Sequence, residues 1–177
     1  MIPSLLRISI LGPESTGKTR LARDLAAHYG TTWCPEYLRE LCELLGRMPL
    51  PSDQRRIVRG QLAGEEAAAA AANGLLFCDT DPVMTGVYAC YYFRDCPGWL
   101  WDVTRARRYD LTLLLSPEGA PWVPDPLRDA PHAREELFER CRAFLKEIGR
   151  RYVVLEGGFA DRLPAAVRAV DLLRRHG

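Results

Sequence analysis

Short, nearly continuous apolar runs alternate with longer segments of helical periodicity along the 177 residues. Apolar runs of this kind are typical of strands that are buried on both faces. The predicted strands are Leu5–Leu11, Thr31–Cys34, Leu75–Cys78, Tyr109–Leu115 and Tyr152–Leu155. The predicted helices are Lys18–Tyr29, Glu36–Leu45, Asp53–Asn73, Pro82–Phe93, Trp99–Arg107, His132–Arg150 and Asp161–His176. This alternation predicts an α/β fold in which helices cover both faces of a mainly parallel sheet.

No internal repeat or linker interrupts this pattern, so we expect residues 1–177 to form a single domain. One connection, Ser116–Pro131, is unusually long and contains five prolines. Connections of this length often serve as lids over a site, and we predict a lid-like segment at 116–131. A rigid surface loop is the alternative.

The first apolar run leads directly into the sequence GPESTGKT, at Gly12–Thr19. This is the complete G-x-x-x-x-G-K-[ST] phosphate-binding loop, in the strand–loop–helix context that gives the motif its meaning. Its backbone N–H groups wrap a phosphate chain, Lys18 is expected to reach the β- and γ-phosphates, and the Thr19 hydroxyl to ligate Mg²⁺. The motif therefore predicts binding of ATP with Mg²⁺. The residues assigned to the nucleotide are Gly12, Pro13, Glu14, Ser15, Thr16, Gly17, Lys18, Thr19 and Arg20.

Acidic residues follow two other predicted strands, where ligands of α/β sheets bind. Asp79 and Asp81 come after one strand and Glu36 after another. A strand-end aspartate can hold Mg²⁺ beside a phosphate loop, and we assign Asp79 with Thr19 to the metal. Asp81 is a second catalytic candidate, although it could simply cap the helix that begins at Pro82. Glu36 could orient or deprotonate a substrate hydroxyl, or be a first-turn acid favoured by the helix dipole.

Two arginines outside the phosphate loop are further candidates. Arg128, in the proline-rich segment, could neutralise charge on a transferred phosphoryl group, or pair with Asp125 or Asp129 at the surface. Arg162 follows a glycine-rich turn after the last strand and could stack on adenine. A turn with Asp161 as the helix cap is the alternative for that region.

Composition and charge limit the classes of partner and the setting that we expect for this chain. The net charge is +1, and Lys18 and Lys146 are the only lysines, so nothing favours a nucleic acid as partner. No segment is long and apolar enough to span a membrane. None of the six cysteines form a C-x-x-C pair, and most resemble small buried apolar residues. This fits a reduced, cytoplasmic setting, although an even count allows disulfides.

Several motifs together resemble the nicotinamide-riboside kinase domain of the NadR-type proteins. They follow in the family's order over nearly the whole chain. The matching segments are GPESTGKT at 12–19, PEYLRE at 35–40, FCDTDPVMT at 77–85, YDLTLLL at 109–115, PWVPDPLRD at 121–129 and GGFADR at 157–162.

This resemblance implies a phosphate-loop kinase that transfers the γ-phosphoryl group of ATP to the 5′-hydroxyl of nicotinamide riboside, giving nicotinamide mononucleotide. It implies substrate contacts from residues within the motifs, and a catalytic role for Lys18 and for the lid arginine, Arg128. The residues expected to contact the substrate are Glu36, Tyr37, Arg39, Asp81 and Trp122.

The chain also departs from the family pattern. The nucleotidyltransferase domain of NadR-type proteins is missing from this sequence, so adenylylation to NAD is not expected from it and we expect a stand-alone kinase. Pro82 follows the Asp-Thr-Asp motif, and Pro126 stands where a glycine is expected. The alternatives are a kinase of another nucleoside, nucleotide or vitamin, and a regulatory ATPase. The chain could also assemble as a homo-oligomer.

Overall fold

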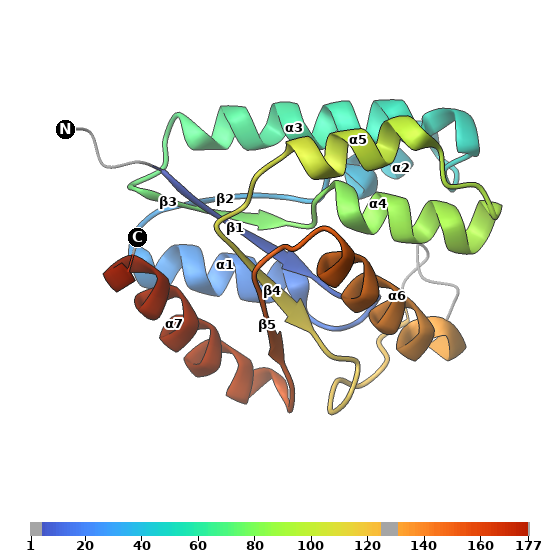
Figure 1. Ribbon diagram of the computed structural model, residues 1–177. Helices are drawn as coiled ribbons and strands as arrows, with labels where there is room; N and C mark the ends of the chain where they lie inside the picture. The colour runs from blue at the N-terminus through green and yellow to red at the C-terminus, as the bar shows by residue number, and fades with distance from the viewer. Residues whose placement is uncertain (1–4, 125–130, 177) are drawn as a thin grey trace.

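Five parallel strands form one sheet in the order β2-β3-β1-β4-β5. The computed structural model describes residues 5–124 and 131–176 (Figure 1). The strands are β1 (Leu6–Leu11), β2 (Thr32–Cys34), β3 (Leu75–Asp79), β4 (Leu111–Leu115) and β5 (Tyr152–Leu155). The helices are α1 (Lys18–Tyr29), α2 (Tyr37–Leu45), α3 (Gln54–Ala69), α4 (Pro82–Tyr88), α5 (Gly98–Ala106), α6 (Arg134–Glu147) and α7 (Phe159–His176). The predicted α/β fold with a parallel sheet is confirmed.

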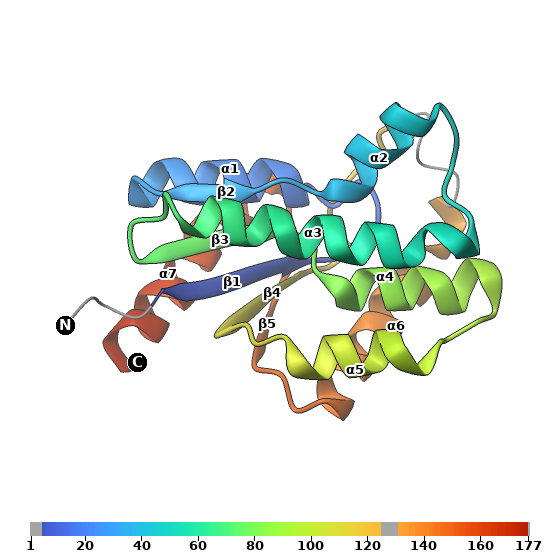
Figure 2. The same ribbon diagram turned by 90° about the horizontal axis from the view of Figure 1, so that it is seen from above.

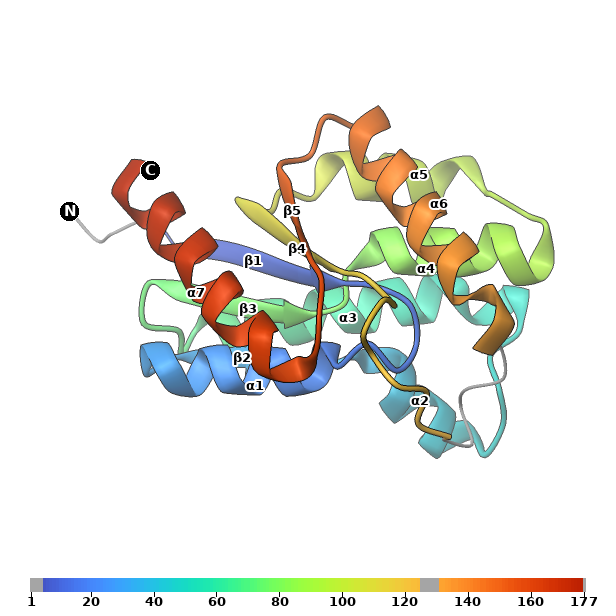
Figure 3. The same ribbon diagram turned by 90° about the horizontal axis from the view of Figure 1, so that it is seen from below.

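Helices cover both faces of this sheet because successive strand residues point to opposite sides. Ile8 and Ile10 of β1 pack in a core with α1 and α7, whereas Leu11 packs with α4 and α6. On that second face, Leu76 and Cys78 of β3 contact α3. Figure 3 shows α7 and α1 together on the first face. No helix within the described residues is both long enough and apolar enough to cross a membrane.

The carboxyl ends of the parallel strands meet at one edge of the sheet. The phosphate loop after β1, the start of α2 after β2, and the start of α4 after β3 therefore come together there. Figure 2 shows α2 projecting beyond this edge, with α3 and α4 beside it. The candidate residues after these strands are thus brought to one place, as the sequence predicts.

Several predicted helices differ at their ends from those in the structure. The expected helix Pro82–Phe93 is divided into α4 and a π-helical turn, η2 (Ala89–Phe93). Short 3-10 turns, η1 (Pro51–Asp53) and η3 (Pro131–Ala133), precede α3 and α6. Proline fixes φ and lacks an N–H, which suits it to such first turns.

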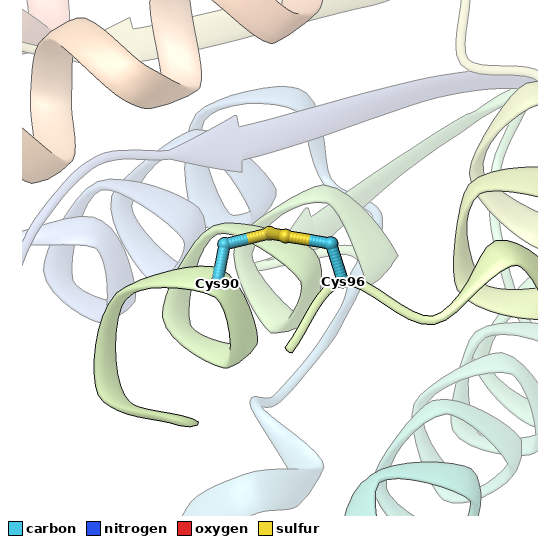
Figure 4. Close-up of a disulfide and its surroundings, with 2 residues drawn as sticks. All are labelled: Cys90 and Cys96. Atoms are coloured by element: carbon cyan, nitrogen blue, oxygen red, sulfur yellow. A yellow bond between two sulfur atoms is a disulfide. The ribbon is translucent and has the colours of Figure 1, made fainter. Parts of the chain in front are cut away.

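A disulfide joins Cys90 in η2 to Cys96, whose Cα atoms lie 5.0 Å apart (Figure 4). The chain turns back after η2 because Arg94 adopts a left-handed conformation with φ of 52°. This disulfide is one that the even number of cysteines allows. The expectation that most cysteines are small buried residues is confirmed by the four free ones, Cys34, Cys42, Cys78 and Cys141, which are buried.

Asp81 forms a buried ion pair that connects the end of β3 to the second helical layer. Its Oδ2 accepts hydrogen bonds from Nη1 of Arg150 and from Oγ of Ser9, both at 2.6 Å. Its Oδ1 accepts from the N–H of Val83 at 2.6 Å and so caps α4. The side chain is fully buried, and Arg150 is 6% exposed. Asp81 is thus held by the core, in agreement with the capping alternative.

Tyr37, the first residue of α2, packs against α3 where Gly60 leaves room for its ring. A Cβ added at Gly60 would lie 2.1 Å from the tyrosine ring. The N–H of Tyr37 also donates to Oε1 of Gln61 at 2.9 Å. These two contacts fix the position of α2, and with it Glu36, relative to the sheet.

We predict that Gly60→Ala destabilises the protein by about 1–3 kcal/mol, because the tyrosine ring must leave its site. This loss exceeds the roughly 1 kcal/mol that alanine gains over glycine in a helix. Urea unfolding measures the change. Gly98→Ala is the matched control, since no atom lies within 4 Å of its added Cβ. Wild-type stability in Gly60→Ala would contradict this packing.

Removal of the Arg150 guanidinium should leave a buried, uncompensated carboxylate at Asp81. We expect Arg150→Met to lower the free energy of unfolding by about 3–5 kcal/mol. The control is Arg105→Met, which breaks an ion pair with Glu147 whose members are 52% and 64% exposed. That change should cost less than about 1 kcal/mol. Equal losses in the two variants would refute a special role for the buried pair.

Candidate functional site

The phosphate loop between β1 and α1 has a conformation that depends on glycine. Gly12 and Gly17 have φ of 147° and 85°. A Cβ at Gly12 would lie 2.7 Å from the carbonyl oxygen of Leu115, and one at Gly17 would lie 2.8 Å from the ring of Phe159. Nζ of Lys18 donates to the carbonyl of Pro13 at 3.1 Å, so the lysine lies across the loop. The helix N-terminus and this ammonium group together favour an anion.

Arg162 braces this loop from α7. Its guanidinium donates to the carbonyls of Thr16 at 2.5 Å and Ser116 at 2.7 Å, and also to those of Glu118 and Gly157. The residue is only 2% exposed. Because its donors are engaged and its side chain is buried, the structure contradicts the expectation that Arg162 stacks on adenine.

The first residues of the predicted lid segment also contact the loop. Oγ of Ser15 donates to the carbonyl of Val123 at 3.1 Å and accepts from its N–H at 3.2 Å. Residues 117–124 form no helix or strand. Arg128, Asp125, Asp129 and Pro126 lie outside the described residues, so the role expected for Arg128 stays a prediction.

Thr19 and Asp79 form the polar pair expected of a metal site. The Thr19 hydroxyl donates to Oδ2 of Asp79 at 2.5 Å. Oδ1 of Asp79 is buried and has no hydrogen-bond partner among the described residues. Burial raises the pKa of Asp79 to about 6, and the nearby Glu36 carboxylate adds to the rise. A cation beside Asp79 would satisfy the open oxygen and favour its ionised form.

Glu36 and the end of β3 are held in place by Thr80 and Gln61. Oγ1 of Thr80 donates to Oε1 of Glu36 at 3.4 Å. Nε2 of Gln61 lies 3.3 Å from the carbonyl of Thr80 and 3.5 Å from that of Asp79. Oε1 of Gln61 accepts a hydrogen bond from the N–H of Tyr37, which follows Glu36. The side-chain amide of Gln61 therefore connects the segments that follow β2 and β3. These contacts position the Glu36 carboxylate near Asp79.

A cavity of about 650 Å³ extends from the phosphate loop between α2, α3 and α4. Lys18, Thr19 and Glu36 lie at one end, as does Arg20. A second region of the cavity wall, away from the phosphate loop, includes aromatic residues of α4 and η2. The residues that line this second region are Arg39, Cys42, Met48, Pro49, Gln54, Ile57, Met84, Thr85, Tyr88, Ala89, Tyr92 and Phe93.

The predicted site residues divide into those that line this cavity and those that do not. Glu14, Ser15, Lys18, Glu36 and Arg39 are among the lining residues. The set of described lining residues lacks three predicted substrate contacts: Tyr37, Asp81 and Trp122. Tyr37 packs on α3, and its substrate contact stays a prediction. Asp81 is enclosed in the core, and its hydrogen bonds to Ser9, Val83 and Arg150 contradict a substrate contact.

Trp122 is half-buried and lies beside Arg134, whose Cζ is 6.0 Å from the ring centroid. The Arg134 guanidinium in turn donates to the carbonyl of Ala120 at 3.0 Å. This tryptophan thus packs against the base of α6, and the structure does not place it at the cavity.

No sequence motif indicates Gln61 and Gln54, which line the cavity from α3 and are both 4% exposed. A helical spacing of seven places both on one face, but it does not reveal that this face is turned to a cavity. Tyr88 and Tyr92 also line the cavity.

The sequence model of the AAA domain family matches residues 7–162. The trifunctional NAD biosynthesis/regulator protein NadR of Salmonella typhimurium is 35% identical over 174 residues, and that of Escherichia coli 31% over 173 residues. Each match covers 94% of this chain and 42% of the relative. The chain thus spans less than half the length of these curated relatives.

Solved structures of NadR proteins also match this chain. A crystal structure of NadR protein in complex with NR has a TM-score of 0.84 and 27% identity, over 94% of this chain and 50% of that chain. One in complex with NAD and AMP-PNP has a TM-score of 0.80 and 27% identity, over 94% of this chain and 48% of that chain. Deoxyadenosine kinase from M. mycoides, at 12% identity and a TM-score of 0.59, covers 94% of this chain and 100% of its own, and shares the fold.

These findings confirm the resemblance to NadR-type proteins that the sequence predicts. They also support the expected class of enzyme, an ATP-dependent phosphotransferase with a nucleotide-binding phosphate loop. The family match extends over most of the chain and includes that loop and the carboxylates at the strand ends. The chain belongs to the AAA domain family.

Proposed function

We propose that this protein transfers the γ-phosphoryl group of Mg²⁺-ATP to the 5′-hydroxyl of nicotinamide riboside, giving nicotinamide mononucleotide. The observation that carries the proposal is the cavity, which is continuous from the phosphate loop to an aromatic wall. A phosphate donor and a nucleoside can therefore occupy its two ends. The NadR structure in complex with NR, which matches 94% of this chain, supports the choice of acceptor.

The aromatic wall suits the proposed acceptor. The rings of Tyr88 and Tyr92 have centroids 6.0 Å apart, and both line the cavity. Nicotinamide riboside carries a positively charged pyridinium ring, and aromatic faces attract such cations. The polar end of the cavity holds Glu36, a suitable acceptor for a ribose hydroxyl.

The residues present fit a magnesium ion. Mg²⁺ takes one or two protein oxygens and otherwise water or phosphate oxygens. Asp79 offers a buried carboxylate oxygen without a hydrogen-bond partner in the described chain, and the Thr19 hydroxyl contacts the other oxygen. We propose that these two side chains hold the ion. When bound, it would offset the negative charge of the phosphates.

The proposed transfer depends mainly on positioning and charge. The loop N–H groups bind the phosphates, and Lys18 exchanges its contact with the Pro13 carbonyl for the β- and γ-phosphates. The 5′-hydroxyl oxygen forms a bond to the γ-phosphorus as the bond to the bridging oxygen of ADP breaks. Glu36 orients the hydroxyl and can accept its proton. Arg128 remains the proposed lid arginine.

Other acceptors share every feature at the phosphate end, so a kinase of another nucleoside, nucleotide or vitamin is the nearest alternative. A regulatory ATPase is less well supported, because a cavity of this size beside the phosphate loop suits an acceptor substrate. We also propose that the enzyme works in the cytoplasm, where ATP serves as donor. A lid at 116–131, a single domain and a homo-oligomer stay predictions.

The proposal predicts that the riboside stimulates ADP release from Mg²⁺-ATP and that mass spectrometry detects the mononucleotide. Lys18→Ala should reduce this transfer by at least about 10²-fold, since one charge at the transferred group is lost. Lys146→Ala is the matched control, because it removes the only other lysine, exposed on α6, and should leave turnover unchanged. No riboside-dependent product from protein that binds ATP would refute the acceptor. Wild-type turnover in Lys18→Ala would refute the mechanism.

A further inference from the structure

The disulfide between Cys90 and Cys96 lies next to the aromatic wall of the cavity. It closes a short loop that contains Tyr92 and Phe93, and both of these residues line the cavity. Cys90 is part of the π-helical turn η2, directly after Ala89, which is another lining residue. Figure 4 shows the two cysteines joined across this turn. The covalent link and part of the cavity wall thus belong to one segment.

The position of the disulfide indicates a local role rather than general stabilisation of the fold. Its two cysteines are only six residues apart. Disulfides that close short loops remove less entropy from the unfolded chain than those that close long ones. Apolar packing already connects the two sides of the loop, because Ala89 and Phe93 share a hydrophobic cluster with Leu100 of α5. The main effect of the link therefore falls on the turn that it closes.

The disulfide is accessible to thiols in solution. Cys96 is exposed and Cys90 is half-buried, whereas the four free cysteines are buried. Exposed disulfides exchange with other thiols more readily than enclosed ones. In the cytoplasm, where we propose that the enzyme works, disulfides are rare and usually act in redox sensing or catalysis. The Cys90–Cys96 pair thus has the accessibility that a redox sensor requires.

The shape of the turn depends on the link. π-helical turns are rare and often mark functional sites. Arg94, directly after η2, has φ of 52°, a left-handed conformation that costs energy. The disulfide spans both of these unusual features and holds them in place. Tyr92 is 39% exposed, so its position on the wall depends on the backbone of the turn more than on core packing. Loss of the link would let the turn relax and move this ring.

We propose that Cys90 and Cys96 form a redox switch that sets the affinity of the cavity for the phosphoryl acceptor. The disulfide form holds the aromatic wall in place and binds the acceptor tightly, whereas the dithiol form binds it weakly. The phosphate loop lies in another region of the cavity, so the nucleotide is bound equally in both forms. This inference rests on the proposed riboside kinase activity.

Reduction of the switch requires a dithiol. One thiolate of the dithiol attacks Sγ of Cys96, so a mixed disulfide forms and the Cys90 thiolate leaves and takes up a proton. The second thiol of the reductant then attacks the reductant's own sulfur in the mixed disulfide and releases Cys96 as a thiol. Two electrons and two protons thus pass to the cysteine pair, and the reductant becomes a disulfide. Oxidation by another disulfide reverses these steps.

The test measures KM for nicotinamide riboside and for ATP in the wild type, after treatment with dithiothreitol or with glutathione disulfide. Alkylation of free thiols, followed by mass spectrometry, verifies the state of the cysteine pair. We expect reduction to raise KM for the riboside about three- to tenfold, because an aromatic contact with the acceptor is weakened. KM for ATP should change less than about twofold, since distant sites act independently.

Two variants control for other effects of the reagents. The double variant Cys90→Ser with Cys96→Ser cannot form the link, so it should show the KM of the reduced wild type under both treatments. Cys141→Ala, which removes a buried free thiol, is the matched control and should keep the wild-type response. A riboside KM that is the same in both redox states, or equal increases for riboside and ATP, would overturn the switch. Free thiols at Cys90 and Cys96 that persist after oxidation would do the same.

Amide hydrogen exchange gives a second readout that does not depend on the acceptor. Reduction should speed exchange in residues 89–97 and leave α1 unchanged, because only the turn loses a constraint. Unchanged exchange at 89–97 in fully reduced protein would contradict the switch. If the wild type phosphorylates the riboside in neither redox state, the proposed function fails instead, and the exchange measurement still decides whether the link controls the wall. The two failures are therefore distinguishable.

Discussion

The reversal of the backbone at Thr80 determines what each of the two aspartates at the end of β3 can do. Thr80 has φ of 75°, which is unusual for a β-branched residue and costs conformational energy. The turn directs Asp79 toward the phosphate loop and Asp81 into the second helical layer. Hydrogen bonds from Gln61 to the Thr80 carbonyl, and from Thr80 to Glu36, hold this conformation. Strain at one residue thus separates the carboxylate that we propose for the metal from a structural one.

Two buried arginines, Arg150 and Arg162, have structural roles, in contrast to Lys18. Arg150 neutralises Asp81 inside the protein, and Arg162 ties the phosphate loop to the ends of β4 and β5 through backbone carbonyls. Both guanidinium groups are satisfied by the protein. Lys18, in contrast, contacts only a carbonyl of its own loop among the described residues, a contact that it can exchange for phosphate. Arg162 braces the loop, and we expect the lysine to supply the mobile charge.

The fold and the phosphate end of the site could be predicted because both depend on local sequence. Apolar runs indicate the parallel strands, and GPESTGKT determines the loop that follows the first of them. The roles of Asp79 and Asp81 could not be separated, since they depend on the sign of one φ angle between them. Arg162 was misassigned because its carbonyl partners include residues of two other connections of the chain, after β1 and after β4.

The arrangement of residues around the rest of the cavity depends on packing between segments that are distant in sequence. Tyr37 lies within a family motif, but the motif does not reveal that Gly60 provides a space for its ring on α3. Gln54 carries no motif, and only the packing of α3 brings it to the cavity. The disulfide depends on a left-handed turn at Arg94 that composition does not reveal.

The central claim is that Asp79, set apart by the turn at Thr80, holds the magnesium ion that accompanies the nucleotide. The most direct measurement is calorimetric titration of a non-hydrolysable ATP analogue, with and without Mg²⁺, into the wild type and Asp79→Asn. Asp24→Asn, which removes an exposed carboxylate that lines the cavity, is the control. We predict that the gain in affinity from Mg²⁺ is lost in Asp79→Asn and retained in Asp24→Asn. A full gain in Asp79→Asn would contradict the account.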